Sequence, residues 1–310
     1  MRAECVGAIE ALALEDPRVI VVVSDPGPKT DFMPELAKKY PERLMVEGVC
    51  EQGIVGISAG LASEGYYPFV MTLAVFATRR CYEQLLLDFG LHGLSGCVVG
   101  NGGGLHYSAL GPTHIAVDDF LLVSAIPGSA VLAPGDAQEA AALIRQARAF
   151  PGLSYLRLID SAEPLAAPGE LTLGQGRLLD EPGDVLFISC GPATSPVRSA
   201  IDILKKEGVK AGGIHLHTVK PLDVELIRRC AQSTRAIVCV EEHRQIGGLA
   251  SAVLQALTSV DSSTIPRRFA SVGIPDSFPG GYGTYQELLG QFGISGSALA
   301  QRAKSLLNVH

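Results

Sequence analysis

Two carboxylates, Glu47 and Glu51, stand at the edge of an apolar, glycine-rich run in the segment VEGVCEQGIVGISAGLASEG at 46–65. A carboxyl group positioned in a water-poor site can give and take protons, so Glu51 is a candidate for acid–base chemistry. In a helix that starts here, Glu51 would lie in the first turn, where the helix macrodipole favours its charge. Acids are common at helix starts, so spacing alone favours a structural role for Glu51 and leaves the catalytic one open.

The glycine-rich loop GGGLHYSALGPTH at 102–114 carries three further side chains that can bond a ligand, His106, Tyr107 and His114. A lone His in a loop is ordinarily a surface residue. The run GNGGG at 100–104 matches neither the dinucleotide-binding fingerprint nor the P-loop. We interpret it as backbone freedom beside a site, because glycine adopts conformations that other residues avoid.

Apolar strands that alternate with helices must position these residues, and this alternation predicts parallel sheet buried on both faces. In the first part of the chain we expect strands at 19–25, 68–73, 96–101, 130–134 and 154–158. Helices are expected at about 2–14, 33–40, 76–90, 115–124 and 136–150, besides the glycine-rich helix after Glu51. The loop with His114 then follows a strand at its carboxyl end, the edge of such sheets where ligands bind.

Residues 159–184 break this alternation, because they are rich in proline, glycine and acidic residues. We expect an interdomain crossing here, with a short edge strand. The alternation restarts with strands at 185–190, 211–219 and 236–243 and helices near 194–207, 222–233, 247–259 and 295–307. The prediction is an α/β protein of two domains with mostly parallel sheets, at 1–165 and 185–310, joined by a crossing at 166–184.

The composition excludes several classes of function. The chain has 310 residues, 47% of them apolar, and a formal charge of −7 without a dense Lys/Arg run, so neither nucleic acid nor an anionic membrane is an expected partner. No apolar run is long enough to span a membrane, and the acidic N-terminus does not resemble a signal peptide. The 7 cysteines are scattered without a CxxC motif, which indicates reduced, buried thiols and a cytoplasmic location.

The segment VEGVCEQGIVGISAGLASEGYYPFVMT at 46–72 resembles the pyrimidine-binding domain of transketolase and of deoxyxylulose-phosphate synthase. In that family the matching Glu hydrogen-bonds the aminopyrimidine ring of thiamine diphosphate. The proton that it gives favours the imino tautomer, which then deprotonates the thiazolium carbon. The resemblance implies that Glu51 activates the cofactor. Glu47 falls where the family often has Asn, Asp or His, and is either a group behind Glu51 or, as we favour, a strand-end acid.

A second segment, FVMTLAVFATRRCYEQLLLDF at 69–89, resembles the family pattern that places an aromatic ring on the pyrimidine face. Phe76 matches that ring, and stacking adds about 0.5–1.5 kcal/mol beyond burial. Without the resemblance, Phe76 would be a core residue at the head of an amphipathic helix. Arg79 and Arg80 follow and can pin a loop or an interface, Arg79 being assigned to the cofactor side. Asp25 falls where the family has a cofactor-side or interface acid.

A third segment, SALGPTHIAVDDF at 108–120, resembles the GPTH loop of transketolases. The matching His of the family bonds the substrate oxygen that becomes negative during attack, and the resemblance assigns that role to His114. His106 is expected to face the substrate as well. The family's acid before GPTH is replaced by Leu110, and its upstream His is not matched, since Asn101 lies nearest. Both departures leave the identity of the donor sugar open.

The resemblance extends to nearly the whole chain. Arg157 aligns with an Arg that binds sugar phosphate, which suits the planar fork of a guanidinium, although a strand-end Arg between domains is an equal alternative. The segments HTVKPLDVELI at 217–227 and VCVEEHRQIGGLASAV at 238–253 resemble the transketolase C-terminal domain. We expect a role in dimer packing for that domain, and no metal site on this chain.

Thiamine diphosphate enzymes hold the diphosphate through Mg²⁺, with a GDG motif followed by an Asn. This chain has no GDG triplet, and its asparagines, Asn101 and Asn308, cannot complete the motif. A Met also precedes the first helix directly. The resemblance therefore implies a split enzyme, in which an N-terminal transketolase subunit with the GDG…Asn motif holds the diphosphate and Mg²⁺. A homodimer of this chain would then form part of a heterotetramer.

The function implied is a transketolase of carbohydrate metabolism, in which this subunit helps to move a two-carbon ketol unit from a ketose, expected to be phosphorylated, to an aldehyde. One alternative is the β subunit of the first component of a 2-oxo acid dehydrogenase, against which the GPTH and KPLD motifs argue. A decarboxylating ligase similar to deoxyxylulose-phosphate synthase is another. A regulatory paralogue without catalysis is the non-enzyme alternative, and the presence of both Glu51 and His114 argues against it.

Overall fold

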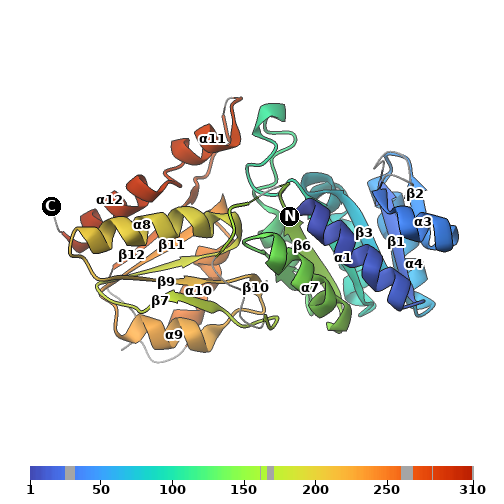
Figure 1. The fold of residues 1–310 in the computed structure, drawn as a ribbon, viewed down its shortest axis with the longest axis horizontal. Coiled ribbons are helices and arrows are strands. Elements are labelled where there is room, and N and C mark those ends of the chain that lie inside the picture. Colours follow the sequence, from blue (N-terminus) through green and yellow to red (C-terminus); the bar gives the residue numbers. More distant parts are fainter. Residues whose placement is uncertain (25–31, 161, 166–170, 260–267, 281, 309–310) are drawn as a thin grey trace. The chain divides into compact units, whose positions relative to one another are not determined.

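The computed structural model describes residues 1–24, 32–160, 162–165, 171–259, 268–280 and 282–308 (Figure 1). By its contacts the chain divides into two compact units. The first consists of Met1–Gly103 and Leu122–Leu173, and the second of Gly104–Leu121 and Gly174–His310. The expected domain limits at 165 and 185 stay predictions. By contacts, however, the segment 104–121 groups with the second unit, although it precedes most of that unit in the sequence.

The sheet of the first unit has the strand order β5-β6-β4-β3-β1-β2, and its neighbouring strands pair in parallel. Most of its residues are buried, which explains the nearly continuous apolar runs of the sequence and confirms the predicted parallel sheet. The strands are β1 Val19–Ser24, β2 Leu44–Glu47, β3 Tyr67–Leu73, β4 Gly96–Asn101, β5 Ala130–Leu132 and β6 Leu153–Leu158.

Helices α1 and α7 lie side by side against this sheet (Figure 1). The α-helices up to this point of the chain are α1 Arg2–Glu15, α3 Pro34–Lys39, α4 Glu51–Ser63, α5 Tyr82–Gln84, α6 Asp119–Ser124 and α7 Ala137–Ala149. α5 is flanked by two π-helical stretches, and short 3₁₀ turns complete the set: π Phe76–Arg80 and Leu85–Leu91, 3₁₀ Pro41–Arg43 and Ser108–Leu110.

The helix expected at 115–124 begins only at Asp119. Before it, Ala116 forms an isolated antiparallel bridge with Gly104, with backbone hydrogen bonds of 2.8 and 3.2 Å, and the two residues that follow form a bend. That bridge closes the segment between them into a loop whose two ends lie together. The prediction of helix at 115–118 was therefore wrong.

The sheet of the second unit has the order β12-β11-β8-β9-β7, in which the edge strand β7 is antiparallel and the others are parallel. In Figure 1, α8 and α12 lie on one side of this sheet and α9 and α10 on the other. The strands of this sheet are β7 Arg177–Asp180, β8 Val185–Ser189, β9 Ala211–His215, β11 Ala236–Arg244 and β12 Arg268–Ile274, and the short strand β10 Thr218–Lys220 is not part of it. The helices are the 3₁₀ turn Gly191–Ala193, α8 Thr194–Lys206, α9 Val224–Gln232, α10 Leu249–Thr258, α11 Tyr285–Gln291 and α12 Gly296–Leu307.

Several details differ from the expectations. The strand predicted at 211–219 is two strands, β9 and β10, and the elements β2, β12 and α11 were not predicted. β7 is the short edge strand expected within 159–184. Cys50 is exposed, contrary to the expectation of buried thiols, whereas the other six cysteines are buried and all seven are free. Within the described ranges, no helix is long and apolar enough to cross a membrane.

Candidate active site

Glu51 is the first residue of α4 and is only 2% exposed. Its carboxylate lies at the helix N-terminus, where the macrodipole stabilises negative charge. Its Oε2 also accepts a hydrogen bond of 2.7 Å from Nη1 of Arg80, whose side chain is 45% exposed. Glu51 is therefore a buried carboxylate whose partner reaches it from the solvent side, unlike a solvated acid at a helix start.

Arg80 also covers the ring of Phe76, since its Cζ lies 4.5 Å from the ring centroid. The two residues are the ends of the π-helical stretch Phe76–Arg80, which follows β3. Such widened turns occur frequently at functional sites. The turn also places Cys81 close by, with its Sγ 3.3 Å from the Phe76 carbonyl oxygen. Burial, with a smaller contribution from the Glu51 carboxylate, raises the pKa of the Cys81 thiol to about 12, so this thiol stays neutral.

Glu51 and Phe76 thus hold one planar group in two ways. The carboxylate binds the N–H edge of the guanidinium, and the aromatic ring packs against its face. A protonated ring nitrogen of an aminopyrimidine likewise offers an N–H in the ring plane and a flat face above it. The geometry therefore fits a flat, nitrogen-rich ring between an acid and an aromatic side chain.

Arg157 is 5% exposed and lies near the carboxyl end of β6. The backbone of Gly103, in the glycine-rich run, packs directly against the Arg157 side chain. A Cβ atom on Gly103 would overlap with Arg157 Cγ and lie 2.6 Å from Cδ. Gly102 has a φ of 73°, which favours glycine for a different reason, its left-handed backbone. The prediction of backbone freedom thus holds for Gly102, whereas Gly103 is needed for close packing.

The first unit brings these side chains to one edge of its sheet. Glu51 follows β2, Phe76 and Arg80 follow β3, and Arg157 lies near the end of β6. The strands are parallel, so their carboxyl ends share one edge, where open α/β sheets bind ligands. The sequence predicted only a loop or interface role for Arg80, not its contact with Glu51. Its position four residues after Phe76 is the signal that could have indicated a shared helical face.

The two candidate His residues lie in the second unit, on the segment Gly104–Leu121. His114 is half-buried, and its Nδ1 lies 2.9 Å from Oγ1 of Thr113. His106 is also half-buried, and its ring lies 5.1 Å from the ring of Tyr107 and 5.8 Å from that of Tyr285. These two expected substrate residues therefore have their supports in the second unit, whereas Arg157 lies in the first.

The remaining predicted residues are less informative. Asp25 falls outside the described residues. Arg79 is exposed, Glu47 is the last residue of β2, as a strand-end acid would be, and Leu110 is 53% exposed in the 3₁₀ turn Ser108–Leu110.

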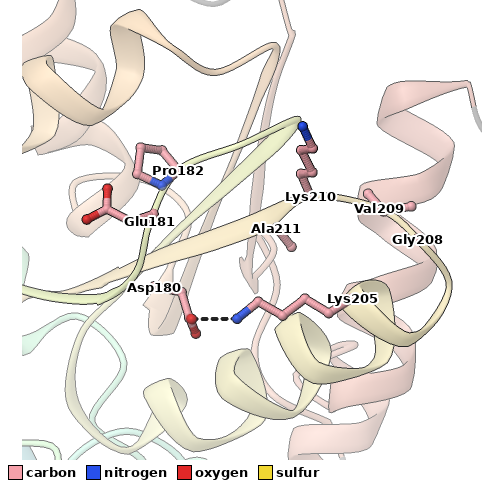
Figure 2. A pocket seen from close by; sticks show the side chains of 8 residues that line it. All are labelled: Asp180, Glu181, Pro182, Lys205, Gly208, Val209, Lys210 and Ala211. Carbon is pink, nitrogen blue, oxygen red and sulfur yellow. Dashed lines mark hydrogen bonds and ion pairs between the residues drawn. The ribbon is translucent and has the colours of Figure 1, made fainter.

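A surface pocket of about 460 Å³ lies beside β7 in the second unit (Figure 2). Lys205 donates to Asp180 at 2.5 Å in this pocket, and Lys210 extends away from that pair. None of the residues predicted for the site lines it. The pocket therefore contributes nothing to the candidate active site.

The chain matches two family models: "Transketolase, pyrimidine binding domain" over residues 1–162, and "Transketolase, C-terminal domain" over residues 174–299. An apulose-4-phosphate transketolase subunit of Phocaeicola vulgatus is 30% identical over 295 residues, which are 94% of this chain and 92% of that protein. A 6-deoxy-6-sulfo-D-fructose transketolase subunit of a Clostridium species is 31% identical, over 94% of this chain and 89% of its own length. A solved structure described as a split gene transketolase, an inactive beta4 tetramer, is similar with a TM-score of 0.87 at 30% identity, over 99% of this chain and 98% of the other.

The packing of Gly103 on Arg157 is testable through stability. Replacing Gly103 by Ala is expected to destabilise the first unit by about 1–3 kcal/mol, because overpacking forces neighbouring atoms to move. Gly7→Ala is the control, since Gly7 lies in α1 with nothing within 4 Å of an added Cβ. That change should stabilise the chain by about 0.5–1 kcal/mol. Urea unfolding of the two variants and the unaltered chain measures both effects, and equal stability of the two variants would contradict the packing argument.

Proposed function

The chain belongs to the transketolase family, and from this premise we propose that it is the subunit of a split transketolase that holds the pyrimidine end of thiamine diphosphate. The observation that carries the proposal is the grip of Glu51 and Phe76 on a planar N–C–N group, the guanidinium of Arg80. The aminopyrimidine ring has the same kind of edge and face. The residues present therefore fit this cofactor.

When bound, thiamine diphosphate supplies the nucleophilic carbon that attacks a ketose carbonyl. Glu51 holds a proton at the ring nitrogen, and its burial keeps water from competing for that proton. Phe76 packs against the ring face and orients it. Both side chains come from the carboxyl edge of the sheet in the first unit, Glu51 after the edge strand β2 and Phe76 after the mostly buried strand β3.

The substrate residues in this proposal are His114, His106 and Arg157. His114 donates a hydrogen bond to the substrate oxygen that gains negative charge, which lowers the energy of the transition state. Arg157 binds an anionic group of the donor through paired N–H donors. Support for an anionic donor comes from the two relatives, whose names contain a phosphate and a sulfo group. The reaction proposed is transfer of a two-carbon ketol unit from such a ketose to an aldehyde.

A second subunit completes the proposed enzyme. The relatives are named as subunits although this chain covers 92% and 89% of their lengths, which supports the view that chains of this size work with a partner. The split gene relative is described as an inactive tetramer of one kind of chain, which also supports a need for another. We assign the diphosphate and Mg²⁺ to that partner, within a heterotetramer that contains a homodimer of this chain.

Reconstitution with a purified partner tests this function. The partner is sought as a neighbouring reading frame with a GDG…Asn motif, and ketol transfer from a phosphorylated ketose is measured with thiamine diphosphate and Mg²⁺. Glu51→Gln is expected to lower kcat about 100-fold or more, because proton transfer by a positioned acid contributes that much. Glu64→Gln, at the opposite end of α4, should keep kcat unchanged.

Three outcomes would contradict the proposal. A Glu51→Gln complex with near-normal turnover would remove Glu51 as the proton donor. Decarboxylation of a 2-oxo acid in place of ketol transfer would favour the synthase or dehydrogenase alternative. Full activity of this chain without a partner would exclude the split arrangement.

Arg80 must release Glu51 when the cofactor binds, and this generates a separate prediction. Arg80→Met is expected to tighten binding of thiamine diphosphate to the assembled complex about five- to thirtyfold. The reason is that a half-exposed ion pair and a cation–π contact, each of about 0.5–1 kcal/mol, no longer compete. Calorimetric titration measures the Kd. Arg145→Met, which removes an exposed pair with Glu15, is the control and should leave the Kd unchanged. Weaker binding in Arg80→Met would instead place Arg80 among the groups that hold the cofactor.

A further inference from the structure

The core of the second unit accepts apolar side chains from the segment Gly104–Leu121. Leu105, Ile115 and Val117 are each at most 1% exposed and belong to the hydrophobic cluster that includes Phe187 of β8 and Val240 of β11. His106 and His114 are adjacent in sequence to two of these anchors. The position of both imidazoles therefore depends on how this segment is held in the second unit.

Glu242, near the end of β11, holds the beginning of the segment. It is 3% exposed, its Oε2 accepts a long hydrogen bond of 3.4 Å from the Leu105 N–H, and its Oε1 accepts the hydroxyl hydrogen of Tyr285. Gly104 permits this approach, because its φ is 62° and an added Cβ would lie 2.5 Å from Oε2 of Glu242. A buried carboxylate thus ties the backbone next to His106 to α11.

Tyr285, which donates to Glu242, also contacts the His106 side chain. Its ring packs edge-on against the imidazole, with centroids 5.8 Å apart. Tyr285 is the first residue of α11, whose start is fixed by a capping box between Thr284 and Glu287. Close by, Oγ of Ser108 donates to the Gly283 carbonyl at 2.8 Å. The turn before α11 and the loop with His106 therefore form one hydrogen-bonded structure.

The other end of the segment is held by β11 as well. The backbone N–H of Arg244 donates to the Val117 carbonyl at 2.8 Å, and the Leu121 N–H donates to Nε2 of His243 at 3.3 Å. The His243 ring stacks on Phe120 at 5.3 Å. Successive residues at the end of one strand, from Glu242 to Arg244, thus contact both ends of the segment.

We infer that Glu242 and Tyr285 are positioning residues of the transketolase reaction, which act through the segment Gly104–Leu121 on His106 and His114. This inference rests on the proposed function, because it takes the two imidazoles as substrate residues. In this inference the second unit contributes to catalysis by positioning the two imidazoles. Glu242 fixes the backbone that carries His106, and Tyr285 orients the imidazole itself.

The test compares Glu242→Ala and Tyr285→Phe with the unaltered chain in the reconstituted complex. Glu242→Ala is expected to raise the donor KM about tenfold or more, because small displacements of substrate-positioning groups are costly. The Kd of thiamine diphosphate should stay within twofold, since Glu51 and Phe76 belong to the first unit. Tyr285→Phe keeps the ring against His106 and loses only the hydroxyl, so a smaller rise of KM is expected. Glu242→Gln should restore a near-normal KM, because its amide can accept from Leu105 and donate to the Tyr285 oxygen.

Asp223→Ala is the matched control. Asp223 is also a carboxylate of the second unit that accepts two hydrogen bonds, from the N–H groups of Gly176 and Leu226, and both are far along the chain from the segment. It should lower the Tm as Glu242→Ala does while leaving the donor KM unchanged. Equal KM effects in the two variants would show that Glu242 acts through general stability only, and would overturn the inference.

Hydrogen exchange in the full chain separates this inference from the proposed function. Exchange of the backbone amides at 105–114 should accelerate at least tenfold in Glu242→Ala and not in Asp223→Ala. Unchanged exchange at 105–114 would overturn the inference even if ketol transfer is observed. Absence of ketol transfer by the unaltered complex would instead remove the proposed function, and accelerated exchange would still support the hold of Glu242 on the segment.

Discussion

The burial of the Glu51 carboxylate is the constraint on which the candidate site depends. A charge that is 2% exposed loses most of its hydration, and the N-terminus of α4 and the guanidinium of Arg80 offset that loss. Arg80 itself remains 45% exposed, so it can return to water at little cost. The result is a buried carboxylate with a replaceable partner, which is what an acid needs if it is to exchange a protein group for a cofactor ring.

Much of the fold could be predicted because its strands are buried on both faces. The runs VIVVVS and GCVVGN leave few alternatives to β1 and β4, and the glycine-rich helix starts where Glu51 suggests. β2 is too short, and β12 too irregular in its burial, to be read from periodicity. The π-helical turn at Phe76–Arg80 has no signal in residue type. Its contact with Glu51 joins residues 29 positions apart, which only the folded sheet brings together.

The segment Gly104–Leu121 shows a different limit. Its motif indicated a substrate residue, His114, but sequence order groups it with the strands that precede it. Leu105, Ile115 and Val117 are buried in the hydrophobic core of the second unit. Their apolar character predicts burial, but it does not indicate in which of the two units they are buried. The run VEEH likewise carries no signal for the position of Glu242, because its hydrogen bond with Leu105 spans 137 positions. The first unit thus carries the candidate cofactor side chains Glu51 and Phe76 together with Arg157, and the second unit carries the two candidate His residues.

The most direct measurement is a crystal structure of the reconstituted complex with thiamine diphosphate. The account predicts the aminopyrimidine ring nitrogen within about 3 Å of a Glu51 carboxylate oxygen, the usual hydrogen-bond distance. The ring should lie against Phe76, with the Arg80 guanidinium displaced from both. A complex in which Arg80 still pairs with Glu51 while the cofactor ring is bound elsewhere would contradict the account.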